Sequence, residues 1–134
     1  MKNVLLLLTV FFLLPQSASA SKEGVLPLSE FRIQSSGIGD SGAVIVEGLK
    51  DSSGIYKSLL IKAFGKTMAV EGALLKQIPL KHQNGVYLSY EEGDKKLGGR
   101  TIYITFLFGF TSGVKEIFII AVTEDGRQSV VKEP

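Results

Sequence analysis

The chain lacks cysteine and tryptophan entirely, and it contains a single histidine, His82, in 134 residues. Without cysteine, the protein has neither disulfide bonds nor thiolate metal ligands. One histidine also leaves too few ligands for a zinc site. We therefore expect no metal and no cofactor, and a fold held together without covalent cross-links.

Asparagine is also scarce, and neither sign of charge predominates. Asn3 and Asn84 are the only asparagines, and neither begins an Asn-x-Ser/Thr glycosylation site. Lys and Arg number 15 and Asp and Glu 13, and the two signs alternate along the chain rather than forming a block. Because a nucleic-acid-binding protein needs a concentrated cationic face, we expect no nucleic-acid partner. The missing cysteines and glycosylation sites favour a bacterial exported protein over an animal secreted one.

The first 20 residues have the three-part pattern of a secretory signal peptide. Lys2 precedes an apolar run over residues 4–14, and the small residues Ala18-Ser19-Ala20 follow. The run is too short to span a bilayer, which takes about 20 apolar residues. We expect cleavage after Ala20, no stable membrane insertion, and a periplasmic or secreted product in which residues 21–134 form a single soluble β-rich domain.

The rest of the sequence alternates short apolar segments with glycine-rich turns, which is typical of an all-β, mainly antiparallel domain. We expect a small immunoglobulin-like β-sandwich or a related barrel. The pair Asp125-Gly126 predicts a tight primed turn in a C-terminal hairpin. Residues 70–78 predict at most one short helix, or a loop that crosses from one sheet to the other. Strands are expected at residues 30–34, 43–49, 56–64, 67–70, 85–91, 101–108, 116–123 and 128–132.

Two neighbouring strands carry the clearest side-chain pattern. In residues 101–110, the even positions Ile102, Ile104, Phe106, Phe108 and Phe110 share one face, which we expect to lie in the core. Residues 117–122 are apolar on both faces, although a half-exposed antiparallel strand should alternate apolar and polar residues. Either residues 74–80 or 25–28 cover the second face, or it is an exposed patch with Tyr87, Tyr103 and Leu107 that docks a partner.

The sequence Gly39-Asp40-Ser41-Gly42 resembles the signature around the reactive serine of chymotrypsin-like proteases. The resemblance covers these four residues, and the Gly-Pro that follows in that family is replaced by Ala43-Val44. The family's histidine precedes its serine, whereas His82 follows Ser41. The chain also has no Gly-x-Ser-x-Gly motif, and its Ser-x-x-Lys pairs lie in turn or strand contexts, where residues three apart face opposite ways. We therefore predict that the protein is not an enzyme and has no catalytic residue.

With catalysis excluded, the sequence predicts an extracytoplasmic protein-binding domain, a monomer or small homo-oligomer. The expected partner is another extracytoplasmic protein. The domain would inhibit a lytic enzyme, act as an immunity protein against a toxin, or serve as a chaperone for a secreted subunit. The loop of residues 51–56 is of the kind that plugs a cleft, and Tyr56 is the expected start of an edge strand that a partner extends. The candidate binding residues are Ser53, Gly54, Tyr56, Tyr87 and Tyr103.

Two alternatives remain open from the sequence. The chain is a structural or accessory subunit of a surface or secretion assembly, in which neighbouring subunits bury residues 117–122. Otherwise it carries a small apolar ligand inside a barrel lined by phenylalanines. The phenylalanines in question are Phe106, Phe108, Phe110 and Phe118.

Overall fold

The computed structural model describes residues 28–109 and 116–132, which form eight antiparallel strands and two short helical segments. The first sheet, sheet A, contains β1 (Glu30–Gln34), β2 (Ile45–Lys50), β3 (Tyr56–Ala63) and β4 (Lys66–Ala69). The second sheet, sheet B, contains β5 (Gln83–Glu91), β6 (Thr101–Phe108), β7 (Glu116–Thr123) and β8 (Gln128–Val131). A 3-10 turn, η1 (Gly39–Ser41), lies between β1 and β2, and a short helix, α1 (Gly72–Leu75), lies between β4 and β5.

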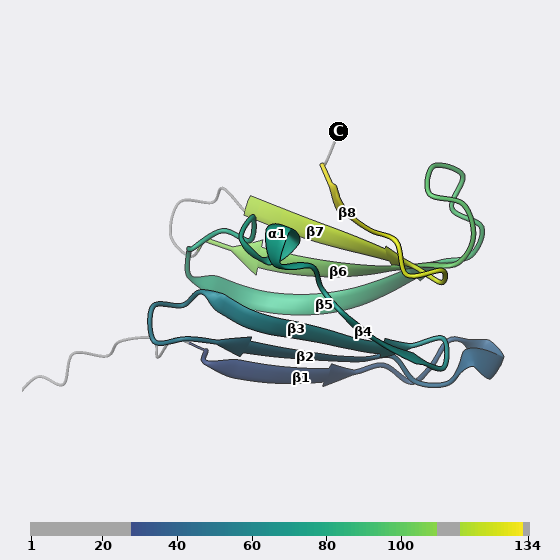
Figure 1. Ribbon diagram of the computed structural model, residues 1–134, viewed down its shortest axis with the longest axis horizontal. Helices are drawn as coiled ribbons and strands as arrows, with labels where there is room; N and C mark the ends of the chain where they lie inside the picture. Colours follow the sequence, from purple (N-terminus) through teal and green to yellow (C-terminus); the bar gives the residue numbers. More distant parts are fainter. Residues whose placement is uncertain (1–27, 110–115, 133–134) are drawn as a thin grey trace, which may run out of the picture.

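The two sheets form the two layers of a β-sandwich, which confirms the predicted all-β fold (Figure 1). Each sheet is a simple meander, because the strands follow one another in the order of the sequence. Immunoglobulin domains instead exchange strands between their sheets in Greek-key connections. Here the chain passes from one sheet to the other once among the described strands, through α1, and the predicted short crossing helix is therefore confirmed.

The core lies between the inner faces of the two sheets. The even positions of β6 are buried, as the alternation predicted: Ile102, Ile104, Phe106 and Phe108 are each at most 1% exposed. Phe110, predicted to continue this row, lies outside the described residues. From sheet A, Val46, Leu59 and Ile61 join the same cluster, and Leu75 and Ile78 of the crossing segment pack against it from the side.

A chain of four aromatic rings runs through the core from sheet A to sheet B. Phe31 meets Tyr56 edge to face at 6.2 Å between ring centroids, and Tyr56 meets Phe106 in the same way at 5.7 Å. Phe106 in turn lies 6.3 Å from Phe118. Edge-to-face pairs contribute about 0.5–1.5 kcal/mol beyond the apolar area that they bury. These rings therefore fix how the two sheets stack.

The C-terminal hairpin forms as predicted, but its turn differs from the expected one. Four residues lie between β7 and β8, and the first three of them, 124–126, form the loop between Thr123 and Arg127; Gly126 has a φ of 91°. Its N–H donates to the carbonyl of Thr123 at 2.9 Å, and the N–H of Thr123 donates to the carbonyl of Arg127 at 3.0 Å. This is the three-residue loop that places glycine in the left-handed region. The two-residue turn with two positive φ angles occurs instead between β3 and β4, at Phe64 (54°) and Gly65 (70°).

Gly48 on β2 provides the first prediction. It pairs with Phe31 of β1, and a Cβ atom built on Gly48 would lie 2.3 Å from Cε1 of the Phe31 ring. A side chain at position 48 must therefore push the first ring of the aromatic chain out of place. We expect Gly48→Val to lower the free energy of unfolding by about 1–3 kcal/mol, the usual cost of overpacking, measured by urea denaturation. Gly72→Val is the control, because the space around Gly72 is open; equal losses in both variants would contradict the assignment.

Candidate functional site

The outer surface of sheet B carries two of the five candidate residues, Tyr87 and Tyr103. The strand register places Tyr87, Thr105, Ile119 and Val131 in one row across the four strands, because paired residues of antiparallel strands point to the same side. Tyr103 belongs to the next row along β6, and Leu107 and Ile117 form the row on the other side of Thr105. We call this surface the tyrosine face. It consists of Tyr87, Tyr103, Leu107, Ile117, Ile119 and Val131.

The tyrosine face is apolar and partly exposed. Tyr87 is 48% exposed, and Leu107, Ile117, Ile119 and Val131 are half-buried. The crossing segment does not cover this surface, since its Leu75 and Ile78 belong to the core cluster. Of the second covering segment proposed from the sequence, residues 25–27 lie outside the described residues and Leu28 is 45% exposed. Within the described chain, Ile117 and Ile119 on the outer side of β7 therefore remain partly exposed, whereas Thr105 and Ala121 beside them are buried.

The loop of residues 92–100 covers the other end of this surface. Its anchor is Asp94, whose Oδ1 accepts the backbone N–H groups of Lys96 at 2.6 Å and Leu97 at 2.9 Å, and whose Oδ2 accepts the hydroxyl of Tyr103. The Tyr103 hydrogen bond, the largest contribution, and those from the two backbone groups lower the pKa of Asp94. Arg127 of the last hairpin donates to the carbonyl of Leu97 at 2.8 Å. Tyr103 therefore has its hydroxyl committed to the loop, whereas Tyr87 is open.

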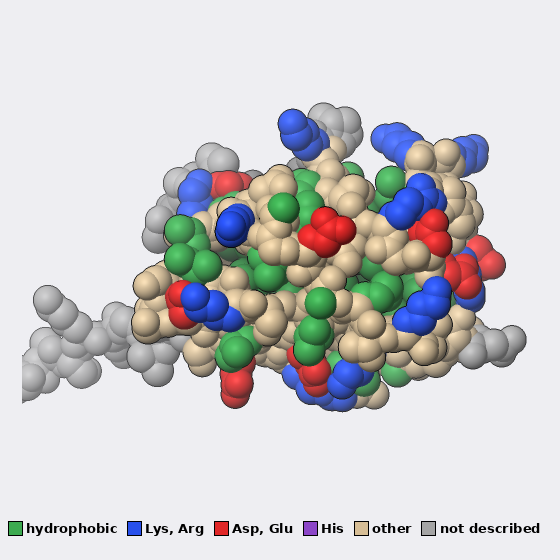
Figure 2. Space-filling view, viewed as in Figure 1, with side chains coloured by type: hydrophobic (Ala, Val, Ile, Leu, Met, Phe, Trp, Pro, Cys, Tyr) green, Lys and Arg blue, Asp and Glu red, His purple; other side chains and the backbone are tan. Residues whose placement is uncertain are grey.

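A groove of about 550 Å³ lies where this loop meets β8. Its floor contains Tyr103 and Val131, and its rim carries Lys95, Lys96 and Lys132. No ion pair among the described residues includes any of these three lysines. Figure 2 shows basic side chains gathered over the 92–100 loop. The groove therefore continues the tyrosine face into a rim where these three lysines lie together with Glu91 and Asp94.

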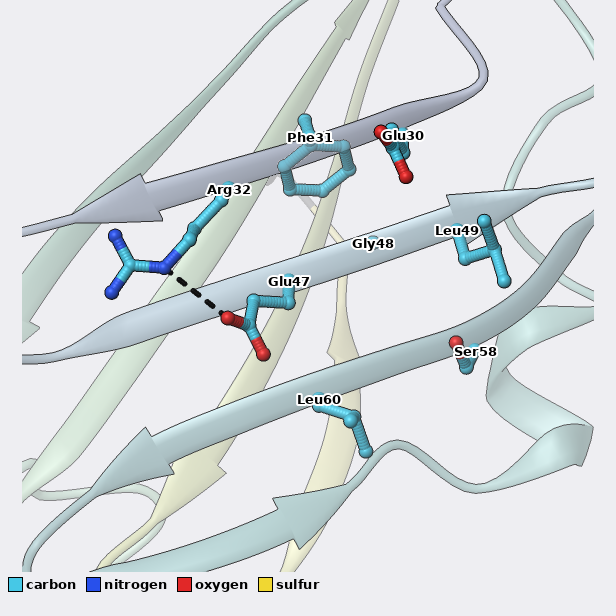
Figure 3. Close-up of a pocket in the computed structure, with 8 residues that line it drawn as sticks. All are labelled: Glu30, Phe31, Arg32, Glu47, Gly48, Leu49, Ser58 and Leu60. Carbon is cyan, nitrogen blue, oxygen red and sulfur yellow. Dashed lines mark hydrogen bonds and ion pairs between the residues drawn. The ribbon is translucent and has the colours of Figure 1, made fainter.

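The outer face of sheet A has a different character. A hollow of about 540 Å³ crosses β1, β2 and β3 (Figure 3). Glu47 in its wall pairs with Arg32 at 3.2 Å and with Lys62 at 3.4 Å. Leu49 and Leu60 also line it, but they alternate with charged and hydroxyl side chains along their strands. Such a mixture of apolar and polar side chains is usual for the solvated face of a sheet, and Glu47 in the wall of the hollow is already paired.

The other three candidate residues lie at one end of the sandwich. Ser53 and Gly54 are in the β2–β3 turn, where Asp51 Oδ1 accepts the N–H groups of Ser53 at 2.9 Å and Ile55 at 3.0 Å. Tyr56 begins β3, which lies between β2 and β4. β4 pairs only with Leu60–Ala63 of β3, so among the described strands Tyr56 is paired on the β2 side alone and lies at a local edge of the sheet. Its side chain is nevertheless buried, at 6% exposure.

Tyr56 instead anchors a polar cluster that joins the two sheets. Its hydroxyl donates to Oε1 of Gln83 at the start of β5, and the ammonium of Lys50 donates to the same oxygen at 2.8 Å. Lys50 also lies 4.7 Å from the centre of the Tyr56 ring. Burial raises the pKa of Tyr56 and lowers the pKa of Lys50. Neither Lys50 nor Gln83 was predicted as a partner, because the two residues lie 33 positions apart on different sheets.

Tyr56 makes stability depend on alkaline pH. Its folded-state pKa lies above the ordinary value of 10.0, so its contribution to stability is complete below about pH 10 and is lost as the pH rises further. We expect Tyr56→Phe to cost about 1 kcal/mol near neutral pH, from the lost hydrogen bond. This deficit should shrink or reverse by about pH 11, because phenylalanine does not ionise. Thermal unfolding of both proteins at several pH values measures it; a constant difference would contradict the assignment.

Ser41 of the protease-like sequence has a structural partner. Its Oγ accepts Nη1 of Arg100 at 2.5 Å, while the same guanidinium pairs with Glu124 through two nitrogens and lies 5.1 Å from the Phe64 ring centre. His82 precedes β5 and Arg100 follows the loop after it, so the nine residues of β5 separate the two by about 30 Å. The structure therefore does not bring Ser41 and His82 together, and Ser41 ties the β1–β2 connection to sheet B.

Among residues 28–109 and 116–132, no three acidic or histidine side chains come together in a way that holds a metal ion. In the same ranges, no helix has the length and apolar composition that a membrane crossing requires. The residues best placed to contact another molecule are therefore those of the tyrosine face, its lysine rim, and the cluster around Lys50.

Comparisons with protein-family models, with curated proteins and with solved structures find no match for this chain. Its functional assignment consequently depends on the geometry of these surfaces.

Proposed function

We propose that the chain is a protein-binding domain that acts outside the cytoplasm, periplasmic or secreted, and works by covering part of another extracytoplasmic protein rather than by catalysis. An inhibitor of a lytic enzyme or an immunity protein against an exported toxin fits this description best, followed by a chaperone for a secreted subunit. The observation that carries the proposal is the tyrosine face, where Tyr87, Leu107, Ile117, Ile119 and Val131 are partly exposed together.

Strand β7 has apolar side chains on its outer side as well as on its inner side. Monomeric proteins rarely leave contiguous apolar patches open unless a partner or ligand uses them. The core does not need this second face, since Ile120 and Val122 already point inward and are fully buried. Outward apolar residues at Ile117 and Ile119 are therefore explained by a contact with another molecule.

The surroundings of the face indicate the chemistry of the partner. An interface commonly has an apolar centre and a polar rim, and complementary charges set its orientation. The rim here is supplied by Lys95, Lys96 and Lys132 around the groove. The partner surface should therefore present apolar side chains to Leu107 and Ile119, and carboxylates to the three lysines.

The alternative of an assembly subunit uses the same face, with further copies or other subunits covering Ile117 and Ile119. The carrier alternative has less support, because Phe106 and Phe108 are fully buried in a packed core and Phe118 packs against it. A cavity lined by Ile38 and by the core residues Val44 and Ile102 measures only about 110 Å³.

Capture from an extract of the native host tests the proposal. The tagged chain is used as bait, and co-eluting molecules are identified by mass spectrometry at low and high salt. We expect one stoichiometric protein whose retention weakens with salt, because the lysine rim contributes to binding. Self-assembly into large oligomers would favour the assembly subunit, and co-eluting lipid without protein would favour the carrier; either result would remove the inhibitor proposal.

A further inference from the structure

A second site lies away from the tyrosine face, at the end of the sandwich where the β2–β3 turn meets the start of β5. A cavity of about 240 Å³ opens there between Ser53 and Gly54 on one side and Gln83 on the other. Lys50 lies in its wall, and Leu28 and Leu80 stand at it as exposed side chains, 45% and 71% exposed. We call this space the end cavity.

Lys50 has no carboxylate partner among the described residues. Its ammonium is held by Gln83 Oε1 and the Tyr56 ring. The two neighbouring acids are already paired, Asp51 with Lys57 at 3.2 Å and Glu116 with Lys81. A partly buried ammonium without a counter-charge costs free energy, which an incoming anion would recover.

Gln83 leaves a second donor unused in the same wall. Its Oε1 accepts both Lys50 and the Tyr56 hydroxyl, which fixes the orientation of the amide. Its Nε2 is then buried with no hydrogen-bond partner. Buried polar groups almost always have partners, and an exception calls for an explanation. Within the described chain, Lys50 therefore lacks a counter-charge, and Gln83 Nε2 lacks a hydrogen-bond acceptor. One carboxylate would supply both.

We propose that the end cavity binds a carboxylate attached to a short apolar group, with the carboxylate against Lys50 and Gln83 and the apolar group against Leu28 and Leu80. This inference does not depend on the tyrosine face. Ser53 and Gly54, which the sequence singled out, are then walls of a small-ligand site rather than a plug for a partner's cleft. The carboxylate has two possible sources, a free short-chain acid or the C-terminus of a polypeptide.

Amide NMR titration of the whole protein tests the site with three probes: hexanoate, the peptide acetyl-alanyl-leucine with a free carboxylate, and the same peptide as its amide. We expect one or both carboxylates to shift the amide signals of Ser53, Gly54 and Gln83, and the peptide amide to leave them unchanged. Hexanoate alone would identify a free acid as the ligand class, and the peptide acid alone a polypeptide C-terminus. No shift with either carboxylate, or equal shifts with the amide, would overturn the proposal.

Gln83→Glu provides the sharpest variant. It keeps an oxygen for Tyr56 and Lys50 and adds the missing carboxylate from within the chain. We expect it to weaken carboxylate binding by about tenfold or more while the melting temperature stays the same or rises. Lys50→Met should weaken binding to a similar extent, whereas Lys62→Met, on the same hairpin but paired with Glu47 on the outer face, should not. Unchanged binding in Gln83→Glu would contradict the proposed position of the carboxylate.

Discussion

Replacing Phe106 with alanine is expected to lower the free energy of unfolding by about 3–5 kcal/mol, the range measured for buried phenylalanines. Phe106 is 0% exposed and is the ring through which sheet A meets sheet B, between Tyr56 at 5.7 Å and Phe118 at 6.3 Å. Removing the ring leaves a cavity between Tyr56 and Phe118. Tyr56 cannot move into it without leaving its contact with Phe31.

Urea denaturation followed by far-ultraviolet circular dichroism measures this loss. A small domain has a total stability of about 5–15 kcal/mol, so a loss of about 3–5 kcal/mol removes between about a fifth and all of it. Tyr87→Ala is the matched control, because Tyr87 is 48% exposed on the outer side of the same sheet and should cost far less. A loss below about 1 kcal/mol for Phe106→Ala would show that the two sheets do not depend on this contact.

Replacing Ile119 with lysine is expected to abolish partner capture without unfolding the protein. Ile119 lies at the centre of the tyrosine face, opposite Thr105 on one side and Val131 on the other. Central apolar residues contribute about 2 kcal/mol or more to many interfaces, and a charge placed there must also be desolvated. Binding should therefore weaken by at least about 30-fold. The lysine stem can lie along the sheet with its charge in water, which limits the loss of stability.

Leu60→Lys is the control for this substitution. Leu60 is half-buried on an inner strand of sheet A, on the face that carries the Glu47 ion pairs. Both variants add one positive charge to the middle of an outer face, and only their sheets differ. Retention of the partner by Ile119→Lys, or equal loss in both variants, would exclude the tyrosine face as the interface.

The fold was largely accessible from the sequence because local patterns determine it. The eight strands follow from short apolar or alternating runs separated by turn residues, and the burial of Phe106 follows from its position in an alternating run. The strands pair with their neighbours in the chain, so short-range signals were enough to define each sheet. The predicted immunoglobulin-like connectivity is not found among the described strands, because each sheet is a meander. Alternation along a strand contains no information about the order of strands in a sheet.

Two turns show where local signals fail. Asp125-Gly126 predicted a two-residue primed turn. The loop instead has three residues between the hydrogen-bonded Thr123 and Arg127, and it requires a positive φ only at Gly126. The primed turn lies at Phe64-Gly65, where a phenylalanine adopts a conformation that is uncommon for bulky residues. The stacking of Arg100 on the Phe64 ring compensates for this conformation, and a contact so distant in sequence is invisible to turn preferences.

The candidate sites depended more on tertiary contacts than the strands did. Tyr87 is 48% exposed, but Tyr103 is hydrogen-bonded to Asp94, and Tyr56 is buried against Gln83. Each of these pairs joins residues at least 9 positions apart. Residue type alone suggested that the tyrosines contact another protein. The structure shows that Tyr56 and Tyr103 already make hydrogen bonds within the chain.

The most direct test of the central claim is methyl NMR of the isoleucine side chains with and without the captured partner. Ile117 and Ile119 report on the tyrosine face, and Ile45, half-buried outside the core on β2, reports on sheet A. Contact through the tyrosine face should shift or broaden the signals of Ile117 and Ile119 and leave Ile45 unchanged. Changes confined to Ile45, or none at any of the three, would contradict the proposed interface.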